Sequence, residues 1–371
     1  MSWFLAFAGF AALIMLHELG HFVAAKACGM RVERFFLFFP PKLVSVKRGE
    51  TEYGIGALPL GGFVKITGMN PDEELPPDVA PRAYYHQPVW RRIVVIGAGP
   101  AVNLLVAFVI LFALGFGLSD LTDEVGETTQ GSAAAGVLEP GDRVVAVDGA
   151  AVAALSGTEL RERIATLVNR HECAGEPQDG CRAERPISLT VERDGERQTV
   201  EVTPTYDAAA PSLDDETETG RMVIGFTYGI EPIDSSPGQA AAFAADRMWF
   251  VTSRTIGVIT RIFDPEQREQ ISSVVGGYEV TRQSIEFDTR QALGVLAIIS
   301  LSLGIINLFP FLPLDGGHIF WSVVEKIRGR PVPFSVMERS GVLGFMLVIL
   351  IFFIGLTNDI ERLSGEGFQV R

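Results

Sequence analysis

Positive charge is scarce in this chain. Lys and Arg number 31 against 45 Asp and Glu, so the net charge is −14, which argues against nucleic acid as a partner. The first apolar run also lacks two features of a signal peptide: no basic segment precedes it, and no small-residue cleavage site follows it. We therefore expect this run to remain in the protein as a membrane-spanning helix.

Cysteine is scarce as well, with three residues in the chain. Cys28 follows the first apolar run, whereas Cys173 and Cys181 lie in an acidic middle region. If that region is outside the cytoplasm, these two can form a disulfide, and otherwise they are free thiols. The sequence leaves both alternatives open.

Apolar residues, in contrast, are abundant, at 47% of the chain with a mean hydropathy of +0.26. A soluble domain is seldom that apolar, so a membrane protein with a soluble insert is expected. Windows of about 20 apolar residues predict spanning helices, at 3–25, 93–118, 292–309 and 342–356. A fifth run, 240–263, carries four charged residues and is predicted to be an amphipathic surface helix.

The first span contains His17-Glu18-Leu19-Gly20-His21, an HExxH motif. Two histidines four residues apart lie on one helix face and can bind one zinc ion, and Glu18 can take a proton from the water bound to the metal. Ionisable groups at membrane depth are costly and usually functional. The motif therefore predicts a catalytic zinc site inside the membrane.

A catalytic zinc needs a third protein ligand. The best candidates follow the third span, in Asn307-Leu-Phe-Pro-Phe-Leu-Pro-Leu-Asp315-Gly-Gly-His318, where two prolines break the helix. Asp315 is favoured, because a carboxylate beside an apolar helix needs a cation to offset its burial. His318 competes with it, while His86 lies in a polar loop and His171 in the soluble insert.

Basic residues orient the predicted spans. They crowd the segments between spans one and two and between spans three and four, so both segments should be cytoplasmic, with the acidic insert on the extracytoplasmic side. In chain order we predict these segments: first span with the HExxH motif (1–26), cytoplasmic loop with a β-hairpin (27–90), second span (91–118), β-rich insert (119–206), acidic linker and amphipathic helix (207–291), third span with the third ligand (292–318), cytoplasmic loop (319–339), fourth span (340–358) and C-terminal tail (359–371).

Two segments show β-patterns. Residues 53–68 alternate short β-type runs with Gly and Pro, which predicts a hairpin or a re-entrant β-loop. In the insert, Asp194-Gly195 between two β-type runs is a strong hairpin signal. The insert resembles a PDZ domain of the bacterial, permuted kind. Such domains add a ligand strand to an exposed edge, although a purely steric role is equally open.

Taken in order, these motifs resemble the bacterial site-2 proteases, intramembrane zinc metalloproteases of the regulator-of-sigma-E protease type. The similarity covers nearly the whole chain, through the HExxH span, the Gly61-Gly62-Phe63 loop, Gly99-Pro100-xx-Asn103, one PDZ insert and Asn307…Pro310…Asp315-Gly316. It implies that His17, His21 and Asp315 bind Zn²⁺ and that Asn307 holds the substrate or the oxyanion. The segment before the third span, 275–280, departs from the Gly-Pro-rich stretch of some relatives.

The resemblance implies a polytopic α-helical protein of the bacterial inner membrane, with a re-entrant cytoplasmic β-loop and a PDZ domain outside. The expected activity is cleavage of single-pass membrane proteins within the bilayer, with a pre-trimmed anti-sigma factor as the expected substrate. We also expect Gly61, Gly62 and Phe63 to contact that substrate and a peptide or protein to be a candidate ligand of the PDZ domain. Signal-peptide or peptide-signal processing, a non-catalytic zinc scaffold and a zinc transporter are the alternatives.

Overall fold

The computed structural model describes residues 1–70, 73–173, 175–211, 213, 219–261, 264, 268, 271–365 and 368. The chain forms two compact units. One comprises Met1–Phe116 together with Ser235–Arg371, and the other is Gly117–Asp234. The second unit is thus inserted into the first, as the composition of the sequence indicated.

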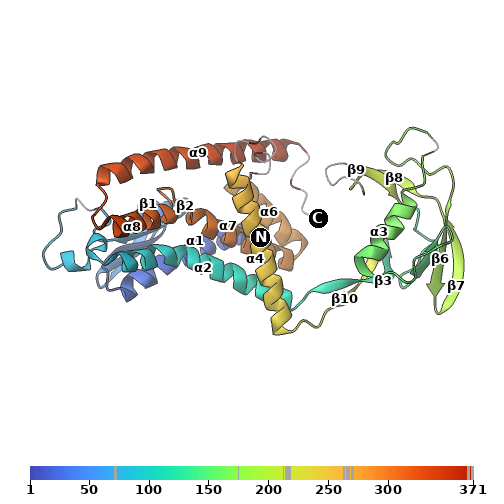
Figure 1. Cartoon of the computed structure of the whole chain (residues 1–371), viewed down its shortest axis with the longest axis horizontal. Helices are drawn as coiled ribbons and strands as arrows, with labels where there is room; N and C mark the ends of the chain where they lie inside the picture. The colour runs from blue at the N-terminus through green and yellow to red at the C-terminus, as the bar shows by residue number, and fades with distance from the viewer. Residues whose placement is uncertain are drawn as a thin grey trace. The chain divides into compact units, whose positions relative to one another are not determined.

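Four helices in the described part of the chain are long and apolar enough to cross a membrane, which confirms the expected number (Figure 1). They belong to the first unit. They are α1 (Ser2–Ala27), α2 (Val89–Gly115), α7 (Thr289–Asn307) and α9 (Phe334–Ser364). Helices α1 and α7 both pack on α2, and this packing builds the centre of the unit.

The third spanning helix ends close to its predicted end at 309, and the rest of the segment predicted to run to 318 belongs to other elements. Helix α7 ends at Asn307, and Asp315 begins a separate helix, α8 (Asp315–Arg328). Pro310 and Pro313 lie between them, and proline has no N–H to continue a helix. Residues 315–328 are therefore helical, whereas the segmentation from sequence ended the third span at 318 and began a loop at 319.

A long hairpin, β1 (Val32–Arg48) and β2 (Thr51–Ile66), lies between α1 and α2 in sequence. Arg34 pairs with both Glu52 and Lys65, so the first half of β1 is flanked by both halves of β2. The turn residue Glu50 accepts hydrogen bonds from Lys26 (2.6 Å) and Arg82 (2.7 Å), and these cations lower its pKa to about 2. The hairpin is thereby tied to the end of α1.

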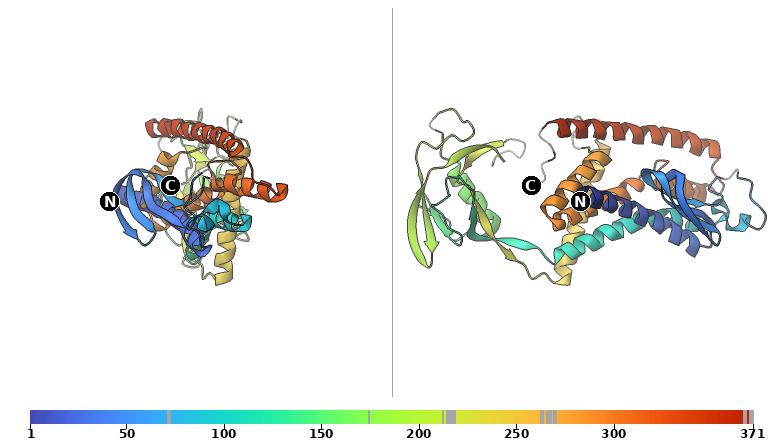
Figure 2. Two further views of the ribbon diagram at one scale, coloured as in Figure 1. Left: turned by 90° about the vertical axis from the view of Figure 1, so that its left-hand side faces the viewer. Right: turned by 180° about the vertical axis from the view of Figure 1, so that it is seen from behind.

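Helix α4 (Pro237–Thr260) runs crosswise to α1 and α2 (Figures 1 and 2). It begins with a capping box between Ser236 and Gln239, with Pro237 in the first turn. Its small residue Ala240 meets Gly115, at the end of α2. The predicted amphipathic segment is thus one helix that packs on α2 and α7.

Helix α6 (Val274–Phe287) precedes α7, and its N-terminus is held by α9. The Asp359 side chain of α9 is fully buried and accepts hydrogen bonds from the Ser273 and Gly276 N–H groups (both 2.8 Å) and from the Ser272 and Ser273 hydroxyls. Gly276 leaves room for it, because a side-chain carbon there would lie 2.4 Å from the carboxylate. Asp359 therefore caps a helix to which it does not belong.

In its described residues, the inserted unit is a β-structure with one α-helix, α3 (Gly157–Val168). Its main sheet has the order β10-β3-β4-β6-β7, with β5 beside β4, and β8 pairs with β9 separately. The strands are β3 (Ser119–Thr128), β4 (Arg143–Val147), β5 (Ala150–Ala151), β6 (Ile187–Arg193), β7 (Glu196–Val202), β8 (Thr205–Pro211), β9 (Thr219–Val223) and β10 (Phe226–Pro232). The unit extends past residue 206, where the linker was expected to start, because β10 pairs with β3.

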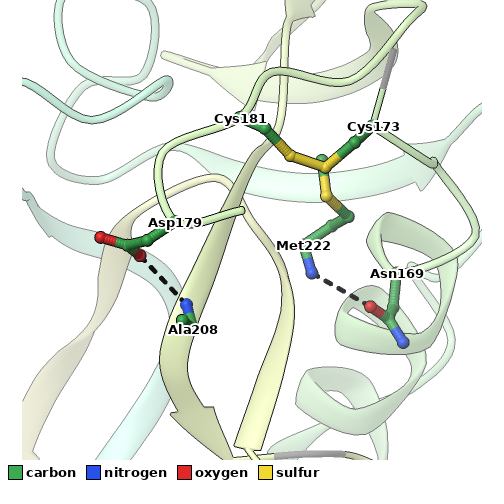
Figure 3. The surroundings of a disulfide bond; sticks show 6 residues. All are labelled: Asn169, Cys173, Asp179, Cys181, Ala208 and Met222. Carbon is green, nitrogen blue, oxygen red and sulfur yellow. Dashed lines mark hydrogen bonds between the residues drawn. A yellow bond between two sulfur atoms is a disulfide. The ribbon is translucent and has the colours of Figure 1, made fainter. Parts of the chain in front are cut away.

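Two cross-links stabilise the inserted unit. Cys173 and Cys181 form a disulfide, which resolves the alternative that the sequence left open, and the Met222 side chain points toward it (Figure 3). Arg193 donates two hydrogen bonds of 2.7 Å to Asp142, whose side chain is almost fully buried. The guanidinium lowers the pKa of that carboxyl group.

Candidate active site

Helix α1 carries both histidines of the HExxH motif on one buried face. His17 and His21 are each 7% exposed, and their Nε2 atoms lie 3.2 Å apart. The four-residue spacing produces this arrangement, because residues i and i+4 stand one above the other on a helix. The lone pairs of both Nε2 atoms can therefore face the same metal position.

Asp315, the first residue of α8, completes a triangle with the two histidines. Its Oδ2 atom lies 3.2 Å from His17 Nε2 and 3.3 Å from His21 Nε2, and it is buried without a hydrogen-bond donor. Ligands of a tetrahedral zinc at about 2.0–2.1 Å stand about 3.3–3.4 Å from one another. The spacing and the N₂O donor set therefore fit zinc with one position left open.

His318 lies outside this triangle. Among the described residues, the group that could hold a metal ion consists of His17, His21 and Asp315. His318 instead lines a small cavity together with Tyr84 and Ser322. His86 bonds to the Ala80 carbonyl oxygen, and His171 pairs with Asp148 in the other unit.

Both imidazole rings are oriented by partners on α2. His21 Nδ1 lies 2.9 Å from the Val95 carbonyl oxygen, so it donates its proton there and leaves Nε2 free for a metal. His17 Nδ1 lies 3.2 Å from the Asn103 carboxamide, whose Oδ1 is buried without a partner. Turning this amide by 180° makes Oδ1 the acceptor for His17 Nδ1–H, which satisfies both groups.

From the sequence, Asn103 is one candidate partner for the imidazole N–H groups, with a hydrogen bond in helix packing as the favoured role. That role exists as well, since its backbone carbonyl accepts a hydrogen bond of 2.9 Å from the buried Ser300 hydroxyl of α7. The contact with His17 depends on how α1 packs against α2, and nothing in the local sequence reports it. Asn103 thus connects three helices at the metal-compatible cluster.

Two glycines allow α1 and α2 to approach closely at this point. A side-chain carbon at Gly99 would lie 2.3 Å from His21 Nε2, and one at Gly20 would lie 2.5 Å from the Ala98 carbonyl oxygen. Both distances are shorter than any real contact of that kind, so larger residues would force the helices apart. The small residues around the motif are thus required by the geometry of the site.

Glu18 lies beside the β-hairpin. A side-chain carbon at Gly62 would stand 2.7 Å from Glu18 Cγ. Phe63 stacks on Phe36 and Phe39, with ring centroids 5.4 and 5.9 Å away, and so fixes this part of β2. Of the hairpin residues singled out from the sequence, Gly62 therefore borders the HExxH motif directly.

Asn307 makes a contact within its own helix. Its carboxamide nitrogen donates to the Leu303 carbonyl oxygen at 3.0 Å, at the end of α7. The side chain is partly buried. A role in holding the substrate or the oxyanion requires that it exchange this bond, and the role stays a prediction.

Comparisons with known proteins identify the family of the chain. The model of peptidase family M50 matches residues 5–351. The chain belongs to this family. It is 33% identical to zinc metalloprotease Rip1 of Mycolicibacterium smegmatis, over 90% of this chain and 88% of the relative. A putative zinc metalloprotease of Nostoc is 31% identical over 99% and 98%, and one of Rhizobium meliloti is 28% identical over 95% and 94%.

These similarities establish the chain's general class. It is a multi-pass membrane protein and a zinc metalloprotease of family M50. The expectations of a protease that uses Zn²⁺ are confirmed.

Proposed function

We propose that the chain is an intramembrane endopeptidase in which His17, His21 and Asp315 hold the zinc. The observation that carries this proposal is the triangle of three buried ligand atoms, two of them on a helix long and apolar enough to span the membrane. A bond hydrolysed at this place lies within the bilayer. The substrate is therefore a membrane-spanning segment.

When bound, Zn²⁺ would act as a Lewis acid that lowers the pKa of water toward about 7 and polarises a carbonyl group. Glu18 takes the proton of the attacking water and delivers it to the nitrogen of the leaving amine. Val95 and Asn103 keep the imidazole rings in the orientation that this requires. Asn307 donates a hydrogen bond to the developing oxyanion or to the substrate backbone.

A spanning helix hides its carbonyl groups in backbone hydrogen bonds, so it must unwind before it is cut. The part of β2 around Gly61, Gly62 and Phe63 borders Glu18 and can pair with an extended substrate. We propose that this segment is a re-entrant clamp that replaces the lost hydrogen bonds. The contact between Gly62 and Glu18, the proposed base, supports this proposal.

We further propose that the protein works in regulated intramembrane proteolysis in the bacterial inner membrane. The inserted unit would be a PDZ domain on the extracytoplasmic side, as the basic segments between the spans suggest. It would bind a peptide or exclude untrimmed proteins. The substrate would then be a single-pass protein already shortened by another protease, such as an anti-sigma factor.

Glu18→Gln tests the enzymatic role. The variant should keep its zinc and lose cleavage of a reporter transmembrane helix by a factor of at least roughly 10²–10⁴, the usual contribution of a general base. Zinc content and cleavage are measured on the same purified, reconstituted sample. Cleavage at the wild-type rate would refute the assignment, and a wild-type protein that binds zinc but cuts no membrane segment would support a scaffold instead.

A further inference from the structure

Helix α4 has a buried face and an outward face of different character. Ala240 and Ala244 are fully buried, the first against Gly115 of α2 and the second in a cluster with Leu111 and Ala297. These contacts hold α4 at the level of the last two turns of α2, crosswise to the spans (Figures 1 and 2). Met248 and Val251 pack further along, against a cluster with Ala107 and Leu301. Since α2 is long and apolar enough to span a membrane, α4 crosses the end of this span that leads to the inserted unit.

The outward face alternates aromatic and basic residues. Phe243, Arg247, Phe250 and Arg254 follow one another at steps of four, three and four, which places them in one row on the helix. The guanidinium of Arg247 lies 5.6 Å from the ring centroid of Phe243, and that of Arg254 lies 5.5 Å from the ring of Phe250. Each arginine therefore stacks on the phenylalanine ring that lies four residues before it in the helix.

These two arginines lack a carboxylate partner among the described residues. Elsewhere in the chain, Arg92, Arg193 and Arg282 each pair with an acid. Asp246 is the acidic residue of α4, and it is exposed without pairing with either arginine in the described ion pairs. Because no described carboxylate pairs with these two guanidinium groups, and each is stacked on a ring, their N–H groups are available to an anion from outside the chain.

We propose that the row Phe243–Arg247–Phe250–Arg254 binds the headgroups of anionic phospholipids. The planar guanidinium forms two parallel hydrogen bonds with a phosphate, and the exposed Phe250 and Trp249 are residues that favour the membrane interface. Anionic lipids attract basic residues close to the surface. The lipid thereby holds α4, and with it the junction of α2 and the inserted unit, at a fixed depth.

The test uses the full-length protein in vesicles of phosphatidylcholine with and without phosphatidylglycerol. Native mass spectrometry of the extracted protein counts the retained phosphatidylglycerol, and titration gives its affinity. The double variant Arg247→Gln/Arg254→Gln should bind it about fivefold more weakly for each arginine removed. Arg247→Lys/Arg254→Lys keeps the charge without the planar fork and should lie between the wild type and the glutamine variant.

A matched control removes the same charge elsewhere. Arg163 and Arg197 are exposed residues of the inserted unit, and Arg163→Gln/Arg197→Gln should leave lipid retention at the wild-type level. Equal retention by the wild type and the α4 glutamine variant overturns the proposal. It is also overturned if that variant keeps its lipid but binds an acidic juxtamembrane peptide less well, because the row then binds protein.

Discussion

Asp315 and His318 lie one helical turn apart at the start of α8, yet only Asp315 reaches the histidines of α1. Asp315→Ala should therefore lose most of the bound zinc, since one of three protein ligands is gone. His318→Ala should retain it. Elemental analysis of both purified variants distinguishes the two candidates, and zinc loss in His318→Ala alone would reverse the assignment.

The Asn103 side chain should matter for zinc affinity through His17. Asn103→Ala removes the hydrogen-bond partner of Nδ1 and should weaken zinc binding roughly 10–100-fold, as is usual for such partners. Asn103→Asp keeps an acceptor and should bind zinc more tightly than the alanine variant. Ser300→Ala, which removes a hydrogen bond to the Asn103 backbone and not to its side chain, is the control in a chelator competition, and it should change little.

The sequence predicted the residues of the site better than their contacts. The four-residue spacing of His17 and His21 is a local property of a helix, and the Asp-Gly-Gly turn after two prolines marks Asp315. The partners Val95 and Asn103 and the closeness of Gly62 to Glu18 arise from tertiary packing between segments far apart in the chain. Such contacts cannot be predicted from residues that are adjacent in the sequence.

At the scale of elements, the β-hairpin can be tested through Gly62. Gly62→Ala inserts a carbon 2.7 Å from Glu18 Cγ, so it should displace the carboxylate and lower the cleavage rate by roughly 10²-fold while zinc stays bound. Gly97→Ala is a matched control, because its new carbon meets only Ile319 at 3.8 Å. Equal rates for both variants would show that β2 does not constrain Glu18.

The cleavage rate should also depend on the backbone N–H groups of this part of β2. Phe63→Pro removes an N–H and should depress cleavage without loss of zinc if an extended substrate pairs with β2. The measurement is the cleavage rate with zinc content determined in parallel. Unchanged cleavage would contradict the proposed clamp, but it would not contradict the assignment of the metal ligands.

The spans were predictable because apolar length is a direct signature of a membrane helix. The separate helix α8 was missed in part, because Asp315-Gly-Gly is also a typical turn sequence. In the structure, these glycines pack on the preceding loop. A side-chain carbon at Gly316 would lie 2.2 Å from the Leu308 carbonyl oxygen. The end of the inserted unit was missed because β10 pairs with β3, across almost the whole unit. Such long-range pairing leaves little trace in sequence.

At the scale of the whole molecule, the inserted unit can be removed as one piece. Ser119 pairs with Pro232, so the two ends of the unit meet. Replacing 117–234 by a short Gly-Ser linker should let the enzyme cut untrimmed substrates at a rate close to that of trimmed ones, if the unit acts as a filter. Cleavage of both reporters is measured, and Glu18→Gln in the shortened chain is the control.

Loss of all cleavage in the shortened chain, with zinc retained, would assign the unit a positioning role. Removing only 123–204 would be a poorer design, because it deletes the second part of β3 and leaves the Phe226–Tyr228 part of β10 as an unpaired strand edge. The boundaries found in the structure therefore determine how the experiment is built.

The buried Asp359 has a consequence for how the protein is assembled during synthesis. Its hydrogen bonds come from Ser272, Ser273 and Gly276, at the beginning of α6. A carboxylate entering the membrane without donors is strongly disfavoured. Helix α9, which follows α6 in the chain, can therefore settle only after the N-terminus of α6 has formed, which sets an order of assembly for these two helices.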